Sequence, residues 1–423
     1  MVERPGLLWD ESGICTMPLW EHEPKIEGII KVFLRLGFAH NRDQLHVSVL
    51  GQGAINKAYL VKIREAGNEK ALVMRVSLPI DPGNKICGEV ATVQWLRRYT
   101  TLPVPEVINY MASPDDDIGY EWILMSHVPG QTALVEWRKM SMNQKRRLVE
   151  QIESYQHELT GQTFDAIGTL RKVEDKYAPG QIVDLEFCFG DHFSYNINRG
   201  PFHCARDWFQ ALADIIVMDF EQVLHEEDLD EFDLTMTKHY LGIVNRLRQL
   251  IPTLFSDTTP ERTVVWHGDL SLSNMIIDED GNLNGIIDWE CISTIPIWAA
   301  TDTPSFLRSQ DRHDEPLPER YYRRAPKVDI YGRDDEGLDD KYWRDLEDYE
   351  FTILRAHYDS CRRHHNPWCK NDLPKDEKLK YDFLDAINVC RAQDLGGAVD
   401  EWIDELEEGN IIALEYGDHA FPL

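Results

Sequence analysis

The stretch "VVWHGDLSLSNMIIDEDGNLNGIIDWE", residues 264 to 290, decides the fold of this 423-residue chain. Asp280 and Gly281 give a strong turn signal between the apolar runs "MII" and "LNGII", which predicts two short antiparallel strands. Asn274 and Asp288 lie seven residues to either side of Gly281. The spacing therefore predicts that an amide and a carboxylate meet at the open end of a β-hairpin.

These two side chains could hold a metal ion. Facing residues at the end of an antiparallel hairpin are about 5 Å apart between their Cα atoms. Mg²⁺ is usually held by a few protein oxygens together with substrate phosphates, so Asn274 and Asp288 are candidate ligands. Asp269 lies on the turn that enters the hairpin, where it could act as the base or the orienting group for an attacking hydroxyl. His267 would brace that loop through hydrogen bonds.

Two simpler interpretations compete with this one. Asp269, Asn274 and Asp288 are residue types that often occupy turns and strand ends, so their role could be structural. Alternatively, His267 and Asp269 could be ligands of a metal phosphohydrolase. The sequence has no further His–Asp pairs at suitable positions, which argues against the second alternative.

A glycine-containing turn and a buried ion pair are the candidate phosphate site. "GQGAIN", with Gly51, Gly53 and Asn56, lies between two predicted strands, where backbone N–H groups can approach phosphates. Arg75 lies on an apolar strand, and Glu89 lies on the buried face of the next helix, so the two charges predict an ion pair. The alternatives are a plain glycine turn and, for the charged residues, a purely structural ion pair or a glutamate favoured by the helix N-terminus.

The pattern along the chain indicates an α+β fold in two parts. Residues 47–78 read as a three-stranded meander, 88–99 as a helix and 120–128 as a strand. We place a boundary near residue 130. Beyond it, residues 143–161, 208–224 and 238–251 have helical apolar spacing, and the last hundred residues look like acidic amphipathic helices.

Two further segments have no periodic pattern. The acidic stretch 225–233 is expected to be a solvated connector, and the run from 301 to 340, rich in Pro, Arg and Asp, an irregular insertion.

The charge balance restricts the class of partner. The formal net charge of −30 argues against binding to nucleic acid or to anionic membranes and would attract a cationic substrate. Acidity that only keeps the protein in solution is the alternative. The start of the chain has no signal-peptide pattern, and no stretch approaches the ~20 apolar residues of a membrane span, so we expect a cytoplasmic protein.

The eight cysteines are scattered, which fits reduced thiols better than a disulfide framework. One cluster, "CRRHHNPWC", holds Cys361, His364, His365 and Cys369, a set that zinc could use. Because the second cysteine pair of a structural zinc site is missing, incidental thiols at a helix end are the preferred interpretation.

"HGDLSLSN" together with "IIDWE" resembles the catalytic loop and metal-binding motif of the aminoglycoside phosphotransferase family, in the branch of small-molecule kinases common in filamentous fungi. The resemblance covers most of residues 45 to 310, including "VMRV", "GEVATVQWL" and "ILMSHVPG". It implies a bilobal protein-kinase-like fold, with an antiparallel-sheet N-lobe at 1–129 and a mostly helical C-lobe at 130–423.

The resemblance also implies roles for individual residues. Asp269 and Asn274 would be catalytic, and Asn274 and Asp288 would bind Mg²⁺. ATP would lie with its base against the backbone of Met125, Ser126 and Val128. Arg75, paired with Glu89, would contact the phosphates.

The sequence departs from the protein-kinase pattern at two positions. Arg75 stands where protein kinases have Lys, as in many members of the small-molecule branch. Glu290 replaces the Gly of D-F-G, which suggests no flipping activation segment.

We therefore expect a Mg-ATP-dependent kinase that phosphorylates a hydroxyl group of a small molecule, with no protein partner evident. The alternatives are a catalytically silent nucleotide-binding scaffold and, less favoured, a protein kinase.

Overall fold

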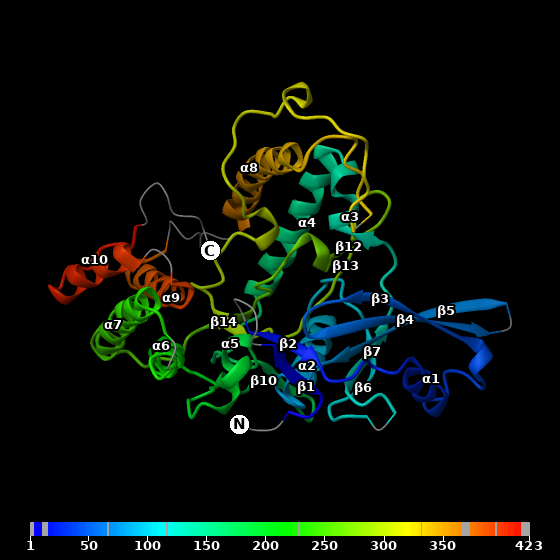
Figure 1. Ribbon diagram of the computed structural model, residues 1–423, viewed down its shortest axis with the longest axis horizontal. Coiled ribbons are helices and arrows are strands. Elements are labelled where there is room, and N and C mark those ends of the chain that lie inside the picture. The colour runs from blue at the N-terminus through cyan, green and yellow to red at the C-terminus, as the bar shows by residue number, and fades with distance from the viewer. Residues whose placement is uncertain are drawn as a thin grey trace. The chain divides into compact units, whose positions relative to one another are not determined.

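Five antiparallel strands form the main sheet of the N-terminal part, in the order β3-β4-β5-β7-β6 (Figure 1). Their bounds are β3 Leu45–Gln52, β4 Asn56–Glu65, β5 Asn68–Ser77, β6 Val107–Met111 and β7 Glu121–Ser126. The predicted meander and the predicted strand at 120–128 are therefore confirmed. The computed structural model describes residues 4–10, 16–65, 67–115, 117–226, 229–330, 332–365, 373–393 and 396–415.

Helix α2, Asn84–Tyr99, packs against this sheet. Ile86 and Val90 of the helix form a buried cluster with Ile123 of β7. The helix starts one turn earlier than the predicted range 88–99. Glu89 lies on its buried side, with 4% of its surface exposed, as its spacing predicted.

Several short elements, some of them beyond residue 130, have no counterpart in the sequence prediction. They are the hairpin β1 Leu7–Asp10 and β2 Met17–Trp20, helix α1 Ile26–Arg35, the hairpin β9 Leu170–Val173 and β10 Lys176–Pro179, and the single turn α5 Leu185–Cys188. Arg4 connects distant segments here: its buried guanidinium donates to the carbonyl oxygens of Ile80 at 2.9 Å and Cys188 at 2.7 Å.

The hairpin predicted from the opening stretch consists of β12 Met275–Ile277 and β13 Leu283–Ile286. Gly281 has a φ of 79°, a conformation that glycine adopts without strain. The Asp278 carboxylate closes the turn by accepting from the N–H groups of Asp280 and Asn282 at 2.9 and 2.8 Å. Strand β8, Gln131–Thr132, pairs with β12 on its other edge.

The rest of the chain is mostly helical, as predicted. The longer helices are α4 Met142–Thr160, α6 Ala205–Val223, α7 Glu231–Leu254, α8 Asp340–His365, α9 Lys375–Ala392 and α10 Gly396–Glu407. A single turn, α3 Ala133–Glu136, precedes them, and the strands β11 Thr263–Val265 and β14 Thr294–Pro296 pair antiparallel.

Two groups of helices form the core of the helical part. Helices α6, α7, α9 and α10 lie side by side (Figure 1). The ring centroid of Phe209 is 5.1 Å from that of Phe255 and 5.2 Å from that of Phe383, so aromatic packing joins α6 to α9. Helix α4 packs against α8, and Leu148 and Ile152 of its predicted apolar face are fully buried.

The acidic stretch 225–233 is a shorter connector than we predicted, because its last residues belong to α7. The Asp230 side chain accepts a hydrogen bond from the N–H of Asp233 at 2.8 Å and so caps the helix. Glu231 and Asp233 lie in the first turn. Acidic side chains are favourable there because the free N–H groups give a helix N-terminus partial positive charge.

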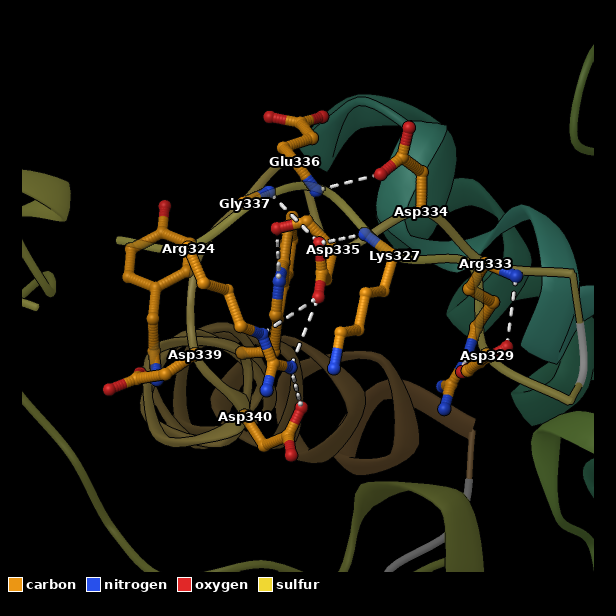
Figure 2. Close-up of polar contacts among 12 residues, drawn as sticks. Arg324, Lys327, Asp329, Arg333, Asp334, Asp335, Glu336, Gly337, Asp339 and Asp340 are labelled. Atoms are coloured by element: carbon orange, nitrogen blue, oxygen red, sulfur yellow. Dashed lines mark hydrogen bonds and ion pairs between the residues drawn. The ribbon is translucent and has the colours of Figure 1, made fainter. Parts of the chain in front are cut away.

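The predicted insertion at 301–340 has short 3₁₀ turns at Ser305–Leu307 and Pro318–Arg320 in its described part. Figure 2 shows how Asp335 holds one of its loops. The Asp335 carboxylate accepts from the N–H groups of Lys327 and Gly337 at 2.8 and 2.9 Å, and from the Arg324 guanidinium at 3.0 Å. Two antiparallel bridges, Arg323 to Leu338 and Val328 to Asp334, flank this carboxylate, so Asp335 adds side-chain hydrogen bonds to a segment that has few backbone ones.

The chain divides into two compact units. Unit 1 comprises Met1–Ala133, Thr169–Ser194 and Ser273–Ser293, and unit 2 comprises Leu134–Gly168, Tyr195–Leu272 and Thr294–Leu423. Unit 1 therefore includes two later segments, one of which holds the β12–β13 hairpin; the single boundary near residue 130 stays a prediction. Among the described residues, no helix combines the length and the apolar character needed to cross a membrane.

Candidate active site

Asn274 and Asp288 lie at the open end of the β12–β13 hairpin, one residue out of the predicted register. The N–H of Ile287 donates to the carbonyl oxygen of Asn274 at 2.9 Å, so Ile287 faces Asn274. The difference arises because the turn is centred on Asp280 instead of Gly281, and a bulge in the hairpin compensates only in part. Asp288 is the next residue along the chain.

The backbone of Asp288 is in the left-handed region, with a φ of 67°, which is uncommon for a residue other than glycine. Trp289 anchors this conformation: it is 1% exposed, and its indole N–H donates to the carbonyl oxygen of Ile286 at 3.0 Å. Such conformations cluster at functional sites, where the surrounding packing holds them. The Asp288 side chain remains 37% exposed.

Arg75 on β5 is a buried cation whose guanidinium contacts three carboxylates. It forms the predicted ion pair with Glu89 of α2. Its Nη1 atom also donates to Oδ1 of Asp288 at 3.0 Å, and its Nη2 atom lies 3.8 Å from Oε2 of Glu290. Arg75 thus joins the main sheet and α2 to the end of the hairpin, all within unit 1.

Lys85 is a second buried cation, which we did not single out in the sequence. Its Nζ atom lies 2.6 Å from Oε2 of Glu290 and donates to Oδ1 of Asn56 at 2.9 Å. The same Asn56 oxygen accepts from the hydroxyl of Ser77 at 2.7 Å. Because Lys85 precedes Glu89 by one helical turn, this spacing was the sequence signal that could have identified it.

The two cations keep Glu290 charged. Burial by itself raises the pKa of Glu290, but the charges of Lys85 and Arg75 outweigh burial and lower that pKa below its usual range. Glu290 is therefore a carboxylate at neutral pH. Burial, followed by the charge of Glu290, raises the pKa of the neighbouring Cys291 thiol, which stays protonated.

The predicted glycine loop is the short turn between β3 and β4. The N–H of Gly53 donates to the carbonyl oxygen of Asn56 at 2.9 Å. A Cβ atom built on Gly51 would have no neighbour within 4 Å, and one on Gly53 would meet only that carbonyl oxygen, at 4.0 Å. The packing of unit 1 therefore does not require glycine at either position.

The segment predicted to contact a nucleotide base follows β7. Met125 pairs with Val73 of β5, and Ser126 ends the strand. Val128 packs against the hairpin at Gly285, where an added Cβ atom would come within 2.8 Å of the Val128 side chain. Glycine at 285 is therefore explained by the close approach of this segment.

Asp269 and His267 lie in unit 2, on the loop after β11. His267 is 7% exposed, whereas Asp269 is exposed. The N–H of Ser271 donates to the carbonyl oxygen of Asp269 at 3.0 Å, and the N–H of Phe306 donates to that of Leu270 at 3.1 Å. Backbone hydrogen bonds therefore hold a loop that carries an exposed carboxylate.

The cysteine and histidine cluster considered for zinc is only partly described. Cys361 lies near the end of α8 and is a free thiol. Cys369 and the side chains of His364 and His365 lie outside the described residues.

The model of the phosphotransferase enzyme family, APH, matches residues 46–168 and 203–299. Together these residues make up more than half of the chain. The chain belongs to this family. Its fold is accordingly protein-kinase-like, with an antiparallel sheet in the N-terminal part and helices in the C-terminal part. The predicted family and fold class are both confirmed.

Similar proteins include a subtelomeric hrmA-associated cluster protein of Aspergillus fumigatus, 22% identical over 64% of this chain and 62% of the relative. Altered inheritance of mitochondria protein 9 of Lodderomyces elongisporus is 21% identical over 82% of this chain and 60% of the relative. The chain thus spans less than two thirds of the length of these relatives. A solved GDP complex of a mutant aminoglycoside 2'-phosphotransferase-IIIa aligns with 91% of this chain and 98% of its own, at 15% identity and a TM-score of 0.41.

Proposed function

We propose that this chain is a Mg-ATP-dependent phosphotransferase that phosphorylates a hydroxyl group of a small molecule. The observation that carries the proposal is the hydrogen bond between Arg75 and Asp288. It joins the buried Arg75–Glu89 ion pair to the hairpin end that holds Asn274. A cation suited to phosphates and two oxygen donors suited to a metal therefore belong to one unit, and the family supports the reaction class.

The residues of unit 1 would bind and orient the nucleotide. Asn274 and Asp288 offer the amide and carboxylate oxygens that suit Mg²⁺, which when bound would neutralise charge on the phosphates. The Arg75 guanidinium, oriented by Glu89, is a competent donor to phosphate oxygens. The turn at 51–53, where packing does not demand glycine, would let backbone N–H groups approach the phosphates. The backbone at 125–128 would contact the base.

Asp269 would accept the proton of the acceptor hydroxyl. As that oxygen bonds to the γ-phosphorus of ATP, the bond from the γ-phosphorus to the bridging oxygen breaks and ADP leaves with the electron pair. The proton remains on the Asp269 carboxylate, which later returns it to solvent. The support for this role is the motif that places Asp269 five residues before Asn274, and the exposure of its side chain.

We further propose a small acceptor that binds over the helical part, because a formal net charge of −30 favours a cationic compound over an anionic one. Membership of the family does not choose between an antibiotic, a metabolite and a biosynthetic intermediate. We also keep the cytoplasm as the proposed location, although one relative has a mitochondrial name.

The test is ATP consumption by the full chain with Mg²⁺ across a panel of amino sugars, aminoalcohols, sugars and secondary metabolites, with GTP in parallel. We expect one class of compound to be phosphorylated. Asp269→Asn should lose at least about 100-fold in turnover, the usual contribution of a positioned base, while nucleotide binding in a thermal-shift assay is retained. Equal turnover in the variant would refute the role of Asp269.

Two other outcomes would replace the proposal. Nucleotide binding without turnover on any acceptor would favour a catalytically silent scaffold. Phosphorylation of proteins in a lysate, lost in Asp269→Asn, would favour a protein kinase.

A further inference from the structure

Three side chains that bind metals elsewhere in proteins meet where α8 packs against α4, within unit 2. His357 and Cys361 are one turn apart on α8, and Glu150 comes from α4. Nε2 of His357 lies 2.8 Å from Oε1 of Glu150 and 3.9 Å from Sγ of Cys361. The three donor atoms all lie within 4.8 Å of one another. No residue of this cluster has a role in the proposed phosphoryl transfer.

We propose that Glu150, His357 and Cys361 bind a zinc ion that joins α4 to α8. Zinc takes thiolate sulfur at about 2.3 Å and imidazole nitrogen or carboxylate oxygen at about 2.0 to 2.2 Å, in a tetrahedron. These bond lengths separate nitrogen from sulfur by about 3.6 Å and nitrogen from oxygen by about 3.4 Å. Side-chain rotations would complete the site if they shorten the His–Cys distance slightly and lengthen the His–Glu distance by about 0.6 Å. They would also have to bring the Cys361 sulfur and the Glu150 oxygen, which lie within 4.8 Å of each other, to about 3.6 Å.

The charges around the cluster favour a divalent cation. The carboxylates of Glu150 and Glu153 interact electrostatically with the Cys361 side chain and would repel a thiolate there. A bound zinc ion would offset that repulsion, because it replaces the thiol proton and is coordinated by the thiolate and by Glu150. His357 would exchange its contact with Glu150 for a bond from neutral Nε2 to the metal. The His357 side chain is 27% exposed, so a water molecule could take the fourth position.

Other contacts between the same two helices hold these three residues in place. The hydroxyl of Tyr358 donates to Oε1 of Gln156 at 2.7 Å, and Nζ of Lys145 lies 2.5 Å from Oε2 of Glu350. These contacts involve residues of α4 and α8 other than the three proposed ligands. The helix spacing at the site is therefore fixed before metal binds, which lowers the cost of ordering the ligands.

The test is zinc binding by the full chain, stripped of metal with a chelator and titrated against a chromophoric zinc indicator. We expect one equivalent to bind, and His357→Ala and Cys361→Ser each to weaken binding at least about tenfold. His313→Ala, which removes an exposed histidine elsewhere, is the matched control and should bind as the unmodified chain does. With cobalt(II) in place of zinc, a thiolate-to-cobalt charge-transfer band should appear and be lost in Cys361→Ser.

A second variant set separates this site from the neighbouring sequence cluster. His364→Ala/His365→Ala/Cys369→Ser should keep zinc affinity; a tenfold loss there would overturn the three-residue site. Unchanged affinity in His357→Ala and Cys361→Ser would overturn it as well. Circular dichroism checks that each variant is folded. If His357→Ala is not, Glu150→Gln decides: the rise in Tm that zinc produces should shrink in this variant, and an undiminished rise would refute the proposal.

Discussion

Lys85 and Glu290 form a buried ion pair, with 2.6 Å between Nζ and Oε2 and none of the Lys85 side chain exposed. The pair connects the first turn of α2 to the segment that follows β13. Arg75 contacts both Glu89 and Glu290, so the two cations and their acids form one network. The same network includes Asp288, which Arg75 also contacts, so the position of Asp288 depends in part on Lys85.

Replacement of Lys85 by Met should destabilise the protein strongly. Removal of one partner of a buried ion pair leaves the other charge without compensation, which costs about 3 kcal/mol or more. Of its two neighbouring cations, Glu290 would keep only the more distant Arg75. Urea unfolding should show a lower midpoint for Lys85→Met than for the unmodified chain.

The double variant Lys85→Met/Glu290→Gln is the matched comparison. Because it removes both charges, its loss of stability should be smaller than the sum of the two single losses. Additive losses would show that the two residues are not coupled and that the ion pair contributes little.

Glu121 should make stability depend on pH. It is 1% exposed on β7, and its Oε1 atom accepts from the N–H of Gly83 at 2.7 Å. Burial raises the pKa of Glu121 from its ordinary 4.5 to about 7. The folded chain therefore holds a proton that the unfolded chain releases between these two pH values.

Protonation of Glu121 contributes to the free energy of unfolding fully below about pH 4.5, and this contribution is lost as pH rises through 7. Glu121→Gln, which stays neutral, should gain stability relative to the unmodified chain by at most about 3 kcal/mol between pH 5 and pH 8. Urea midpoints at the two pH values measure this difference. Glu106→Gln, at an exposed position, should gain no stability relative to the unmodified chain between pH 5 and pH 8. An equal gain in both variants would contradict the raised pKa of Glu121.

Local patterns were enough to predict two structural features of the candidate site, the hairpin and the Arg75–Glu89 ion pair. The Asp280–Gly281 turn placed the hairpin, because a tight turn between two apolar runs has few other solutions. The Arg75–Glu89 pair followed from two charges on faces that had to be buried. Both inferences needed only residues close in sequence and the rule that buried charges are paired.

Other features depend on packing between distant segments, which periodicity does not encode. The sequence did not indicate that Lys85 meets Glu290, because α2 and the segment after β13 are about 200 residues apart. The sequence did not indicate Glu150 as a possible ligand either. The histidines and the cysteine that the sequence placed near Cys361 follow it along the chain. The described partners of Cys361 are His357, one helical turn earlier, and Glu150 on another helix. The predicted hairpin register was one residue out because the turn is centred on Asp280 instead of Gly281, and the sequence marked neither this centre nor the bulge that compensates for it in part.

Asp288→Asn should weaken Mg-dependent nucleotide binding if Asp288 is a metal ligand. Asn is the suitable replacement, because it tolerates a φ of 67° better than most residues and keeps one oxygen while it removes the charge. We expect ATP affinity measured by calorimetry with Mg²⁺ to fall at least about tenfold, with a smaller change when Mg²⁺ is replaced by EDTA.

Asp280→Asn, in the exposed turn of the same hairpin, is the control and should bind ATP normally, because Asn-Gly also suits such turns. If Asp288→Asn lowers ATP affinity equally with and without Mg²⁺, Asp288 does not act as a metal ligand. Its carboxylate would then support ATP binding by accepting the hydrogen bond from Arg75. An unchanged affinity in both conditions would remove Asp288 from the nucleotide site.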